Sequence, residues 1–275
     1  MTLELNCPLV LVGAGKMGGA LLSGWLGKGL APKSIFVRDP SPAPEVAKLI
    51  AERGIGLNFS VADIAAKNPA VVLLAVKPQL MDAVLPELKP LVSPDTLFLS
   101  IAAGTSLHRL KQLLGDDMRA VRAMPNTPSA VGRGMTACYA NALVSAEQRD
   151  VAHTLLSAVG DVGWVESEPL IDAVTAISGS GPAYVFYLAE CLAAAGEALG
   201  LTPALAMQLA RATVAGAGEM LHQMPDDAAT LRKNVTSPGG TTAAALDVLM
   251  GEGGLSPLMR RAAAAARDRA RELGS

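Results

Sequence analysis

The sequence predicts an α/β fold in which a doubly wound parallel sheet is followed by an all-helical half. Short apolar runs alternate with helical patterns up to about residue 165, whereas the later patterns are long and rich in alanine and leucine. A glycine-rich loop also follows the first apolar run. Because the runs are apolar on both faces, helices must cover both sides of the sheet. We therefore expect one domain at residues 1–165 and a helical domain at 166–275.

Composition excludes several classes of protein. The chain has 275 residues, of which 51% are hydrophobic and 17% charged, so it can bury sizeable cores. Its formal net charge of −2 offers no basic field to a nucleic-acid backbone or an anionic membrane. The longest purely apolar run, residues 70–76, is far shorter than a membrane span. We expect a soluble protein with no nucleic-acid or membrane partner.

The three cysteines, Cys7, Cys138 and Cys191, are widely spaced and lie in no CxxC pair or Cys/His cluster. An odd number without metal-ligand spacing indicates neither a disulfide framework nor a zinc site. The start of the chain also lacks the basic stretch and cleavage motif of a secretory leader. We expect buried thiols, no metal and a cytoplasmic location.

Strands are expected where short β-branched or apolar runs end in glycine, proline or a charge. These runs lie at residues 9–12, 35–38, 71–76, 96–101 and 118–123. The intervening segments have helical patterns, so right-handed crossovers should connect parallel strands. Two further strands, at 135–139 and 162–165, are expected at the sheet edge with a helix at 146–159 between them.

The second half is expected to contain helices separated by glycine and proline. Pro182, Pro203 and Pro257 each lie near the start of an apolar-periodic stretch, where the missing N–H costs nothing. The expected helices span residues 169–178, 182–200, 203–223, 227–234, 241–251 and 255–272. Small residues such as Ala193 and Gly196 allow close packing, and a bundle of this size often completes its core with a partner.

The first loop has the spacing of a dinucleotide-binding turn. In GAGKMG, Gly13, Gly15 and Gly18 follow the first expected strand and open a helical pattern. The first glycine makes the tight turn, the second lets the backbone approach a pyrophosphate, and the third lets the helix pack on the strand. We expect a Rossmann-type domain whose loop, including Lys16 and Met17, binds the cofactor. A glycine-rich turn without a ligand is the alternative.

Two charged residues end the second expected strand. Asp39 lies 21 residues after Gly18, where a carboxylate would bond the ribose hydroxyls of NAD. Arg38 could instead stack on adenine or bind a 2′-phosphate, which would favour NADP. The residues leave NADH and NADPH open, together with the alternative that either side chain is an ordinary solvated charge.

Five further segments occur in order: AVKP at 75–78, SIAAG at 100–104, RAMPNTP at 122–128, SGSGPAY at 178–184 and TSPGGTT at 236–242. Together, over essentially the whole chain, they resemble the pyrroline-5-carboxylate reductase family. SPGGTT followed by a helix is the most distinctive segment, since several dehydrogenase families share the glycine loop. The resemblance implies the final step of proline biosynthesis, in which NAD(P)H reduces the C=N bond of L-1-pyrroline-5-carboxylate. It also implies a homodimer of interlocking helical domains, with a decamer built from dimers as a further assembly.

The resemblance assigns the remaining cofactor residues. Those expected at the nicotinamide ribose and its phosphate are Ala75, Val76, Lys77 and Pro78. Those expected to border the nicotinamide are Ala102, Ala103, Gly104, Met124, Pro125 and Asn126. The AVKP and SIAAG segments lie at the ends of expected strands, and open parallel sheets bind ligands at the edge formed by the carboxyl ends of their strands. Ordinary strand-ending turns are the alternative.

The SPGGTT segment is expected to bind the substrate. It opens a helical pattern, so it should offer unpaired N–H groups and the positive helix end to a carboxylate. The residues assigned to the substrate are Ser237, Gly239, Gly240, Thr241 and Thr242. Thr242 is the catalytic candidate, because its hydroxyl can bond the ring nitrogen beside that carboxylate. Plain N-capping by Ser237 or Thr241 is the alternative.

The reaction requires little acid catalysis, because a protonated imine already activates its carbon, and the enzyme mainly positions the reactants and excludes water. His108, His153 and His222 lie in helical stretches away from the motifs, so we assign them no role. Family members often carry Glu-His-Pro shortly before SPGGTT, where this chain has Asp226, Asp227 and Ala228. We therefore leave Asp226 outside the site.

Three other functions are considered. A β-hydroxyacid dehydrogenase needs a lysine on its domain-connecting helix, but no lysine occurs between Lys111 and Lys233. An imine reductase acting on another cyclic imine shares the hydride chemistry and is the nearer alternative. A non-catalytic dinucleotide sensor would not need the SPGGTT loop.

Overall fold

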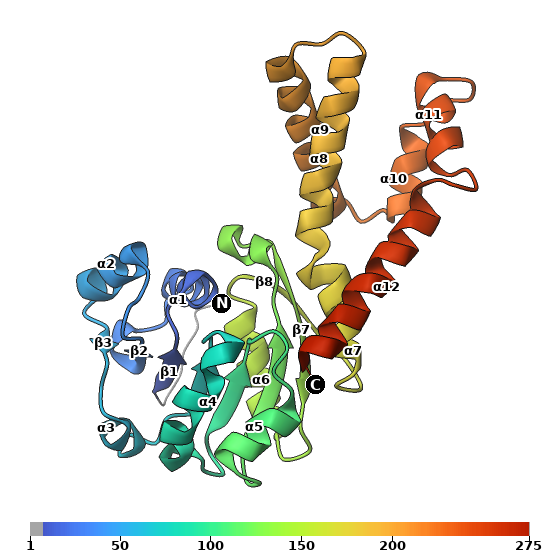
Figure 1. Cartoon of the computed structure of the whole chain (residues 1–275). Coiled ribbons are helices and arrows are strands. Elements are labelled where there is room, and N and C mark those ends of the chain that lie inside the picture. Colours follow the sequence, from blue (N-terminus) through green and yellow to red (C-terminus); the bar gives the residue numbers. More distant parts are fainter. Residues whose placement is uncertain (1–7, 275) are drawn as a thin grey trace. The chain divides into compact units, whose positions relative to one another are not determined.

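The computed structural model describes residues 8–274, and an eight-stranded sheet lies at the centre of its first unit (Figure 1). The strand order is β3-β2-β1-β4-β5-β6-β7-β8. Their bounds are β1 Leu9–Val12, β2 Ile35–Arg38, β3 Gly56–Leu57, β4 Val71–Leu74, β5 Leu97–Ser100, β6 Arg119–Met124, β7 Gly134–Ala140 and β8 Gly160–Trp164. The order reverses between β1 and β4, which confirms the predicted doubly wound fold.

Every strand that the sequence predicts is present, but the sheet is not wholly parallel. β7 pairs antiparallel with β6, because the chain returns through the short 3₁₀ helix Thr127–Val131 (η4) and not through a crossover helix. β4 ends at Leu74 rather than at residue 76, and β5 is one residue shorter at each end than expected. β3 was not predicted, because two residues form no recognisable apolar run.

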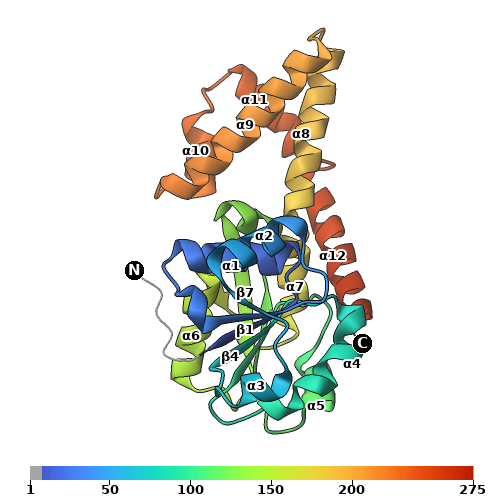
Figure 2. The same cartoon turned by 90° about the vertical axis from the view of Figure 1, so that its left-hand side faces the viewer.

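Helices cover both faces of the sheet (Figure 2). The α-helices of this unit are α1 Lys16–Gly27, α2 Pro44–Arg53, α3 Val61–Ala65, α4 Met81–Val84, α5 Leu107–Leu114, α6 Ala146–Leu156 and α7 Leu170–Val174. The other short helices are η1 Pro32–Ser34, η2 Pro78–Leu80, η3 Leu85–Leu91, η4 and the π-helical turn Thr175–Gly179. The helix expected at 146–159 therefore ends early, and that expected at 169–178 divides into α7 and the π turn.

Strand β1 shows why the sheet needs two cores. Leu9 and Leu11 pack with residues of α1, α2 and α6, whereas Val10 and Val12 pack with residues of α3, α4 and α5. All four side chains are at most 1% exposed. Burying such a side chain contributes roughly 1.5–3 kcal/mol, so both faces stabilise the position of the loop that follows β1.

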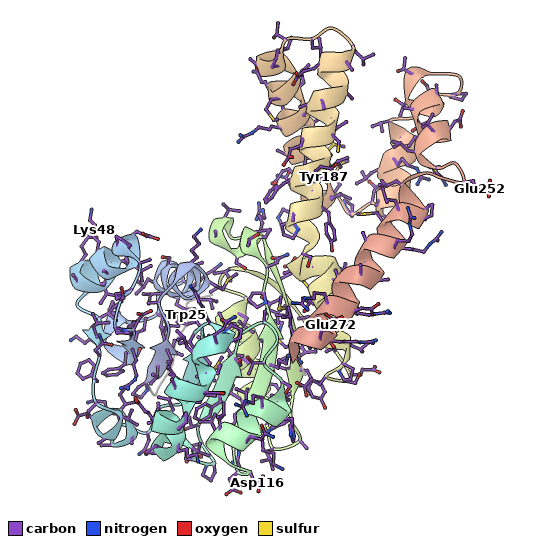
Figure 3. All side chains as sticks on the ribbon, viewed as in Figure 1. Trp25, Lys48, Asp116, Tyr187, Glu252 and Glu272 are labelled. Carbon is purple, nitrogen blue, oxygen red and sulfur yellow. The ribbon has the colours of Figure 1, made fainter. Side chains whose placement is uncertain are left out.

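Both tryptophans of the chain lie in this unit. Trp25 of α1 is fully buried, and its indole N–H donates to the carbonyl oxygen of Leu155 in α6 at 2.8 Å (Figure 3). Trp164 ends β8, where the guanidinium of Arg149 lies 4.3 Å from the ring centroid. These contacts fasten α1 and α6 to the sheet.

The second unit consists of helices. Their bounds are α8 Gly181–Ala198, α9 Pro203–Gln223, α10 Ala228–Asn234, α11 Thr241–Leu249 and α12 Leu255–Gly274, the last of which continues into the first unit. α8 and α9 pack side by side through the buried Ala193, Ala206 and Ala210. A Cβ on Gly196 would lie 3.2 Å from that of Ala206, so small residues allow the close approach that the sequence predicts.

Contacts divide the chain after Gly179, with the segment from Arg267 onward joining the first unit and Ser180–Ala266 forming the second. The change in composition lies earlier, at 165/166, because α7 belongs by composition to the helical half but packs against β6 and β7. The domain boundary at 165/166 stays a prediction.

The cysteines differ in burial. Cys138 of β7 is buried, and this burial raises the pKa of its thiol to about 12, although Arg149 opposes the rise. Cys191 of α8 is exposed, so the expectation of a buried thiol is wrong there. Helix α8 packs mainly on α9, and the face of α8 that carries Cys191 is not covered within one chain. Cys7 lies outside the described residues.

No helix among residues 8–274 is long and apolar enough to span a membrane.

Candidate cofactor and substrate sites

The three glycines of the first loop have three different surroundings. Gly13 has φ +95°, and a Cβ there would lie 2.7 Å from the carbonyl carbon of Ala75. A Cβ on Gly18 would collide with the carbonyl oxygen of Gly13. A Cβ on Gly15 would meet no atom within 4 Å. Gly13 and Gly18 therefore allow the loop to close on its neighbours, whereas Gly15 leaves one side of the loop open.

The carboxyl ends of β1, β2, β4 and β5 meet at one edge of the sheet. The Gly13 N–H donates to the carbonyl oxygen of Arg38 at 3.0 Å, and the Ala75 N–H donates to that of Val12 at 2.7 Å. The Ile101 N–H likewise donates to the carbonyl oxygen of Leu74 at 3.0 Å. The structure thus brings the glycine loop, Arg38, AVKP and SIAAG together, as the sequence predicts. At this edge the strand order reverses, and open α/β sheets bind ligands at such a point.

The carboxylate of Asp39 holds the glycine loop. Its Oδ2 accepts from the Ala14 N–H at 2.6 Å, and its Oδ1 accepts from the Ser41 N–H at 2.8 Å. Asn58 brackets the same residue, since its Oδ1 accepts from the Asp39 N–H and its Nδ2 donates to the Asp39 carbonyl, both at 2.9 Å. Lone pairs remain on both carboxylate oxygens for a ribose hydroxyl. Asn58 was not predicted, and only its place after a strand in a left-handed conformation (φ +55°) distinguishes it.

Arg38 has two partners within the protein. Its Nη2 forms an ion pair with the Oε2 of Glu87, and its Nη1 lies 3.5 Å from the carbonyl oxygen of Phe59. Glu87 belongs to η3, which follows β4 along the chain. The Arg38 side chain thus has partners within the protein, and its role toward a cofactor stays a prediction.

Two hydrogen bonds hold the side-chain amide of the RAMPNTP loop in place. The Asn126 Nδ2 donates to the Ser178 Oγ at 3.1 Å, and its Oδ1 accepts from the Met135 N–H at 2.9 Å. A Cβ on Gly179 would lie 2.7 Å from the Met124 Cε, so the π turn also packs on this loop. Asn126 therefore positions the loop through its own side chain.

The SIAAG segment is supported by the last turn of α12. Gly104 has φ +74°, and a Cβ there would lie 3.2 Å from the carbonyl oxygen of Leu273. Ala102 is buried, whereas Ala103 is exposed. The remaining predicted cofactor residues lie in the first turn of α1, at the end of β4 and at the start of η2; they are Lys16, Met17, Val76, Lys77 and Pro78.

A network of charged side chains around the buried Arg122 lies beside these loops. The Glu168 Oε1 accepts from the Leu107 N–H, at the start of α5, at 2.7 Å and from the Arg122 Nη1 at 3.0 Å. The Arg122 Nη2 lies 3.6 Å from the Asp172 Oδ1, and the Arg271 Nε lies 4.0 Å from the Asp172 Oδ2. The Arg122 side chain is only 8% exposed. Glu168 thus connects the segment after SIAAG with the strand that leads into RAMPNTP.

Glu168→Ala should lower the free energy of unfolding by roughly 2–4 kcal/mol, because the Leu107 N–H loses its acceptor and a buried guanidinium loses one partner. A urea titration followed by circular dichroism measures this loss. Asp82→Ala is the control, since it breaks an exposed pair with Arg109 and should cost less than about 1 kcal/mol. Equal losses in the two variants would contradict the structural role of Glu168.

The SPGGTT segment lies in the second unit. Gly239 has φ +67°, and Gly240 is the N-cap of α11. No side chain caps this helix in the described structure, so the alternative of N-capping by Ser237 or Thr241 is not supported. Thr241 and Thr242 form its first turn, and Thr242 is half-buried. The start of α11 therefore combines backbone donors with a nearby threonine hydroxyl.

The residues left outside the predicted site lie in helices or at a helix start. His108, His153 and His222 lie in α5, α6 and α9, as expected. Asp227 caps α10, accepting from the Thr230 N–H at 2.7 Å, and these hydrogen bonds from Thr230 lower the pKa of its carboxyl. At the position where family members often carry the His of Glu-His-Pro, this chain thus has Asp227, which caps helix α10.

The fold and the glycine loop define an NAD(P)H-dependent oxidoreductase with a helical second unit. A pyrroline-5-carboxylate reductase from Pseudomonas aeruginosa is 42% identical over 265 residues, which cover 96% of both chains. The chain belongs to the pyrroline-5-carboxylate reductase family. Two family profiles match it: pyrroline-5-carboxylate reductase dimerisation at residues 168–273 and NADP oxidoreductase coenzyme F420-dependent at residues 8–104.

Solved structures agree with this assignment. A pyrroline-5-carboxylate reductase from Coxiella burnetii has a TM-score of 0.91 and 38% identity, covering 98% of this chain and 100% of its own. A pyrroline carboxylate reductase from Plasmodium falciparum, solved with NADP bound, has a TM-score of 0.80 and 30% identity, with coverages of 98% and 99%. The predicted combination of a Rossmann-type domain and a helical dimerisation domain is therefore confirmed.

Proposed function

We propose that this protein reduces L-1-pyrroline-5-carboxylate to L-proline with NAD(P)H. The observation that carries the proposal is that one chain combines a glycine loop open at Gly15 with a helix start at Thr241 that no side chain caps. The first arrangement suits a pyrophosphate, and the second suits a small carboxylate. Relatives that cover almost the whole chain carry this activity in their names, which supports the same assignment.

The residues have separate tasks in this reaction. A bound NAD(P)H would supply the hydride for the new C–H bond at the imine carbon and would leave as NAD(P)+, while the C=N π electrons would become the lone pair of the ring nitrogen. Backbone N–H groups of the glycine loop hold the pyrophosphate, and the AVKP, SIAAG and RAMPNTP segments hold the nicotinamide end. Backbone N–H groups near Gly240 hold the substrate carboxylate, and the Thr242 hydroxyl bonds the ring nitrogen. The protein thus acts mainly by positioning the two reactants.

The helical unit is proposed to form a homodimer, and dimers to assemble into a decamer. The dimerisation profile at residues 168–273 supports association. Large apolar side chains on α8 and α9 also remain exposed in one chain, among them Phe186, Leu192 and Leu209. Light scattering coupled to gel filtration should give the mass of two or ten chains, and a monomer at micromolar concentration would contradict the proposal.

The cytoplasm remains the proposed location. The described cysteines, Cys138 and Cys191, are both free thiols, which suits a reducing compartment. Fractionation of cells that produce the protein should recover it with cytoplasmic markers. Recovery with the membrane or secreted fraction would contradict this location.

The activity is tested by following the near-ultraviolet absorbance of NADH and NADPH in parallel with pyrroline-5-carboxylate. Rapid loss of absorbance together with formation of proline is the expected result. A folded protein that binds dinucleotide but does not turn over should be offered other cyclic imines. Activity with those imines alone would favour the imine reductase alternative, and activity with none would favour a dinucleotide sensor.

A further inference from the structure

We infer that Glu87 is a specificity-determining residue: by pairing with Arg38, it disfavours a dinucleotide that carries a 2′-phosphate and so favours NADH over NADPH. The inference rests on the proposed cofactor site at the carboxyl end of the sheet. It concerns the one chemical difference between the two cofactors: the adenosine ribose of NADPH carries a 2′-phosphate, whereas that of NADH carries a 2′-hydroxyl.

Arg38 stands where this difference is recognised. It is the last residue of β2, and its carbonyl oxygen accepts from the Gly13 N–H of the glycine loop. In doubly wound folds, the adenosine ribose lies at the end of the second strand, and an arginine there accommodates a 2′-phosphate. The guanidinium frequently does so through two parallel N–H donors.

These donors already have partners in the protein. The Arg38 Nη2 pairs with Glu87 and the Nη1 faces the Phe59 carbonyl oxygen, so both ends of the guanidinium fork are directed at acceptors. The Arg38 side chain is 27% exposed, less than the 58% of Glu87. A 2′-phosphate would have to displace Glu87 or share the guanidinium with it, whereas a 2′-hydroxyl makes no such demand.

The position of Glu87 is fixed by the core. It lies in η3 between Leu85 and Leu88, both of which are fully buried. The turn that presents the carboxylate is therefore anchored on either side, and Glu87 cannot move away with its backbone at low cost.

Two other charged side chains lie near this strand end. Asp39 adds a second carboxylate, which faces the Ala14 and Ser41 N–H groups. Lys67 lies over the Phe36 ring, 5.7 Å from its centroid, on the strand that carries Arg38. Glu87 and Asp39 would both repel the two negative charges of a 2′-phosphate. The wild-type protein should therefore use NADH more efficiently than NADPH.

Glu87→Gln tests the inference directly, because it keeps the shape of the side chain and removes its charge. Calorimetric titrations should compare adenosine 2′,5′-bisphosphate with AMP, so that binding is measured without any imine. We expect the affinity for the bisphosphate to rise about three- to tenfold, with the affinity for AMP unchanged. The ratio of kcat/KM for NADPH to that for NADH should rise by a similar factor.

Two further variants complete the test. Glu52→Gln removes a carboxylate that pairs with Lys48 on α2, and it should leave both affinities unchanged. Adding Arg38→Gln to Glu87→Gln should abolish the gain. The inference is overturned if Glu87→Gln leaves the bisphosphate affinity unchanged, if it strengthens AMP equally, or if Glu52→Gln gives the same gain. Failure of the reduction assay with the binding difference intact would contradict only the proposed reaction.

Discussion

Gly15→Val should weaken dinucleotide binding by at least about 100-fold while the protein stays folded. The conformation is not the obstacle, because Gly15 has φ −74°, which any residue can adopt. Space inside the protein is not the obstacle either, since a Cβ there meets no atom within 4 Å. The valine instead occupies the open side of the loop and keeps the pyrophosphate from its N–H donors. Hydrogen bonds to a charged group contribute roughly 1.5–3 kcal/mol each, so losing two gives this factor.

Calorimetric titration with NADH measures the loss, and circular dichroism verifies the fold. Gly27→Val is the matched control, because Gly27 ends α1, has no atom near its added Cβ and lies outside the loop. Gly18→Val, in contrast, should destabilise the protein, since its Cβ would collide with the Gly13 carbonyl oxygen. Unchanged NADH affinity in a folded Gly15→Val protein would mean that this loop binds no dinucleotide.

Thr242→Ala should lower kcat/KM for pyrroline-5-carboxylate by roughly 10- to 100-fold. The hydroxyl is proposed to bond the charged ring nitrogen, and such a bond contributes about 1.5–3 kcal/mol. The start of α11 should persist, because it carries no side-chain cap that the substitution could remove. The affinity for NADH, measured separately, should stay unchanged.

The conservative variant distinguishes the hydroxyl from the shape of the side chain. Thr242→Ser keeps the hydroxyl and should retain most of the activity. An undiminished kcat/KM in Thr242→Ala would exclude the assigned role. A loss of equal size in Thr242→Ser would assign the effect to the methyl group and its packing.

The sequence predicted those parts of the fold that depend on local pattern. The run LVLV at 9–12 had to be a doubly covered strand, because four consecutive apolar residues need cores on both faces, and the structure has both. The prolines marked helix starts correctly, as at Pro203. The direction of β7 could not be predicted in this way, because it depends on how the chain turns at η4 and not on the pattern within the strand.

The candidate site was predicted only where backbone geometry dictates the residue type. The glycine spacing predicted close packing at Gly13 and Gly18 and an open side at Gly15, and the surroundings of an added Cβ agree at all three positions. Side-chain pairings across long separations were missed. Arg38 and Glu87 are 49 positions apart, and Leu107 and Glu168 are 61 apart, so no periodicity relates them. Whether the SPGGTT residues bind the substrate stays a prediction.

The placement of the two tryptophans means that the tryptophan fluorescence of the protein reports on one unit only. Trp25 and Trp164 both belong to the first unit, so intrinsic indole emission records the state of that unit and is silent about Ser180–Ala266. Trp25 in particular is sealed from water and hydrogen-bonded to Leu155, so its emission should shift to longer wavelength only when α1 leaves the sheet. A denaturation curve followed by this signal alone would describe one half of the molecule. Circular dichroism, which weighs helices heavily, would record the helices of both units together.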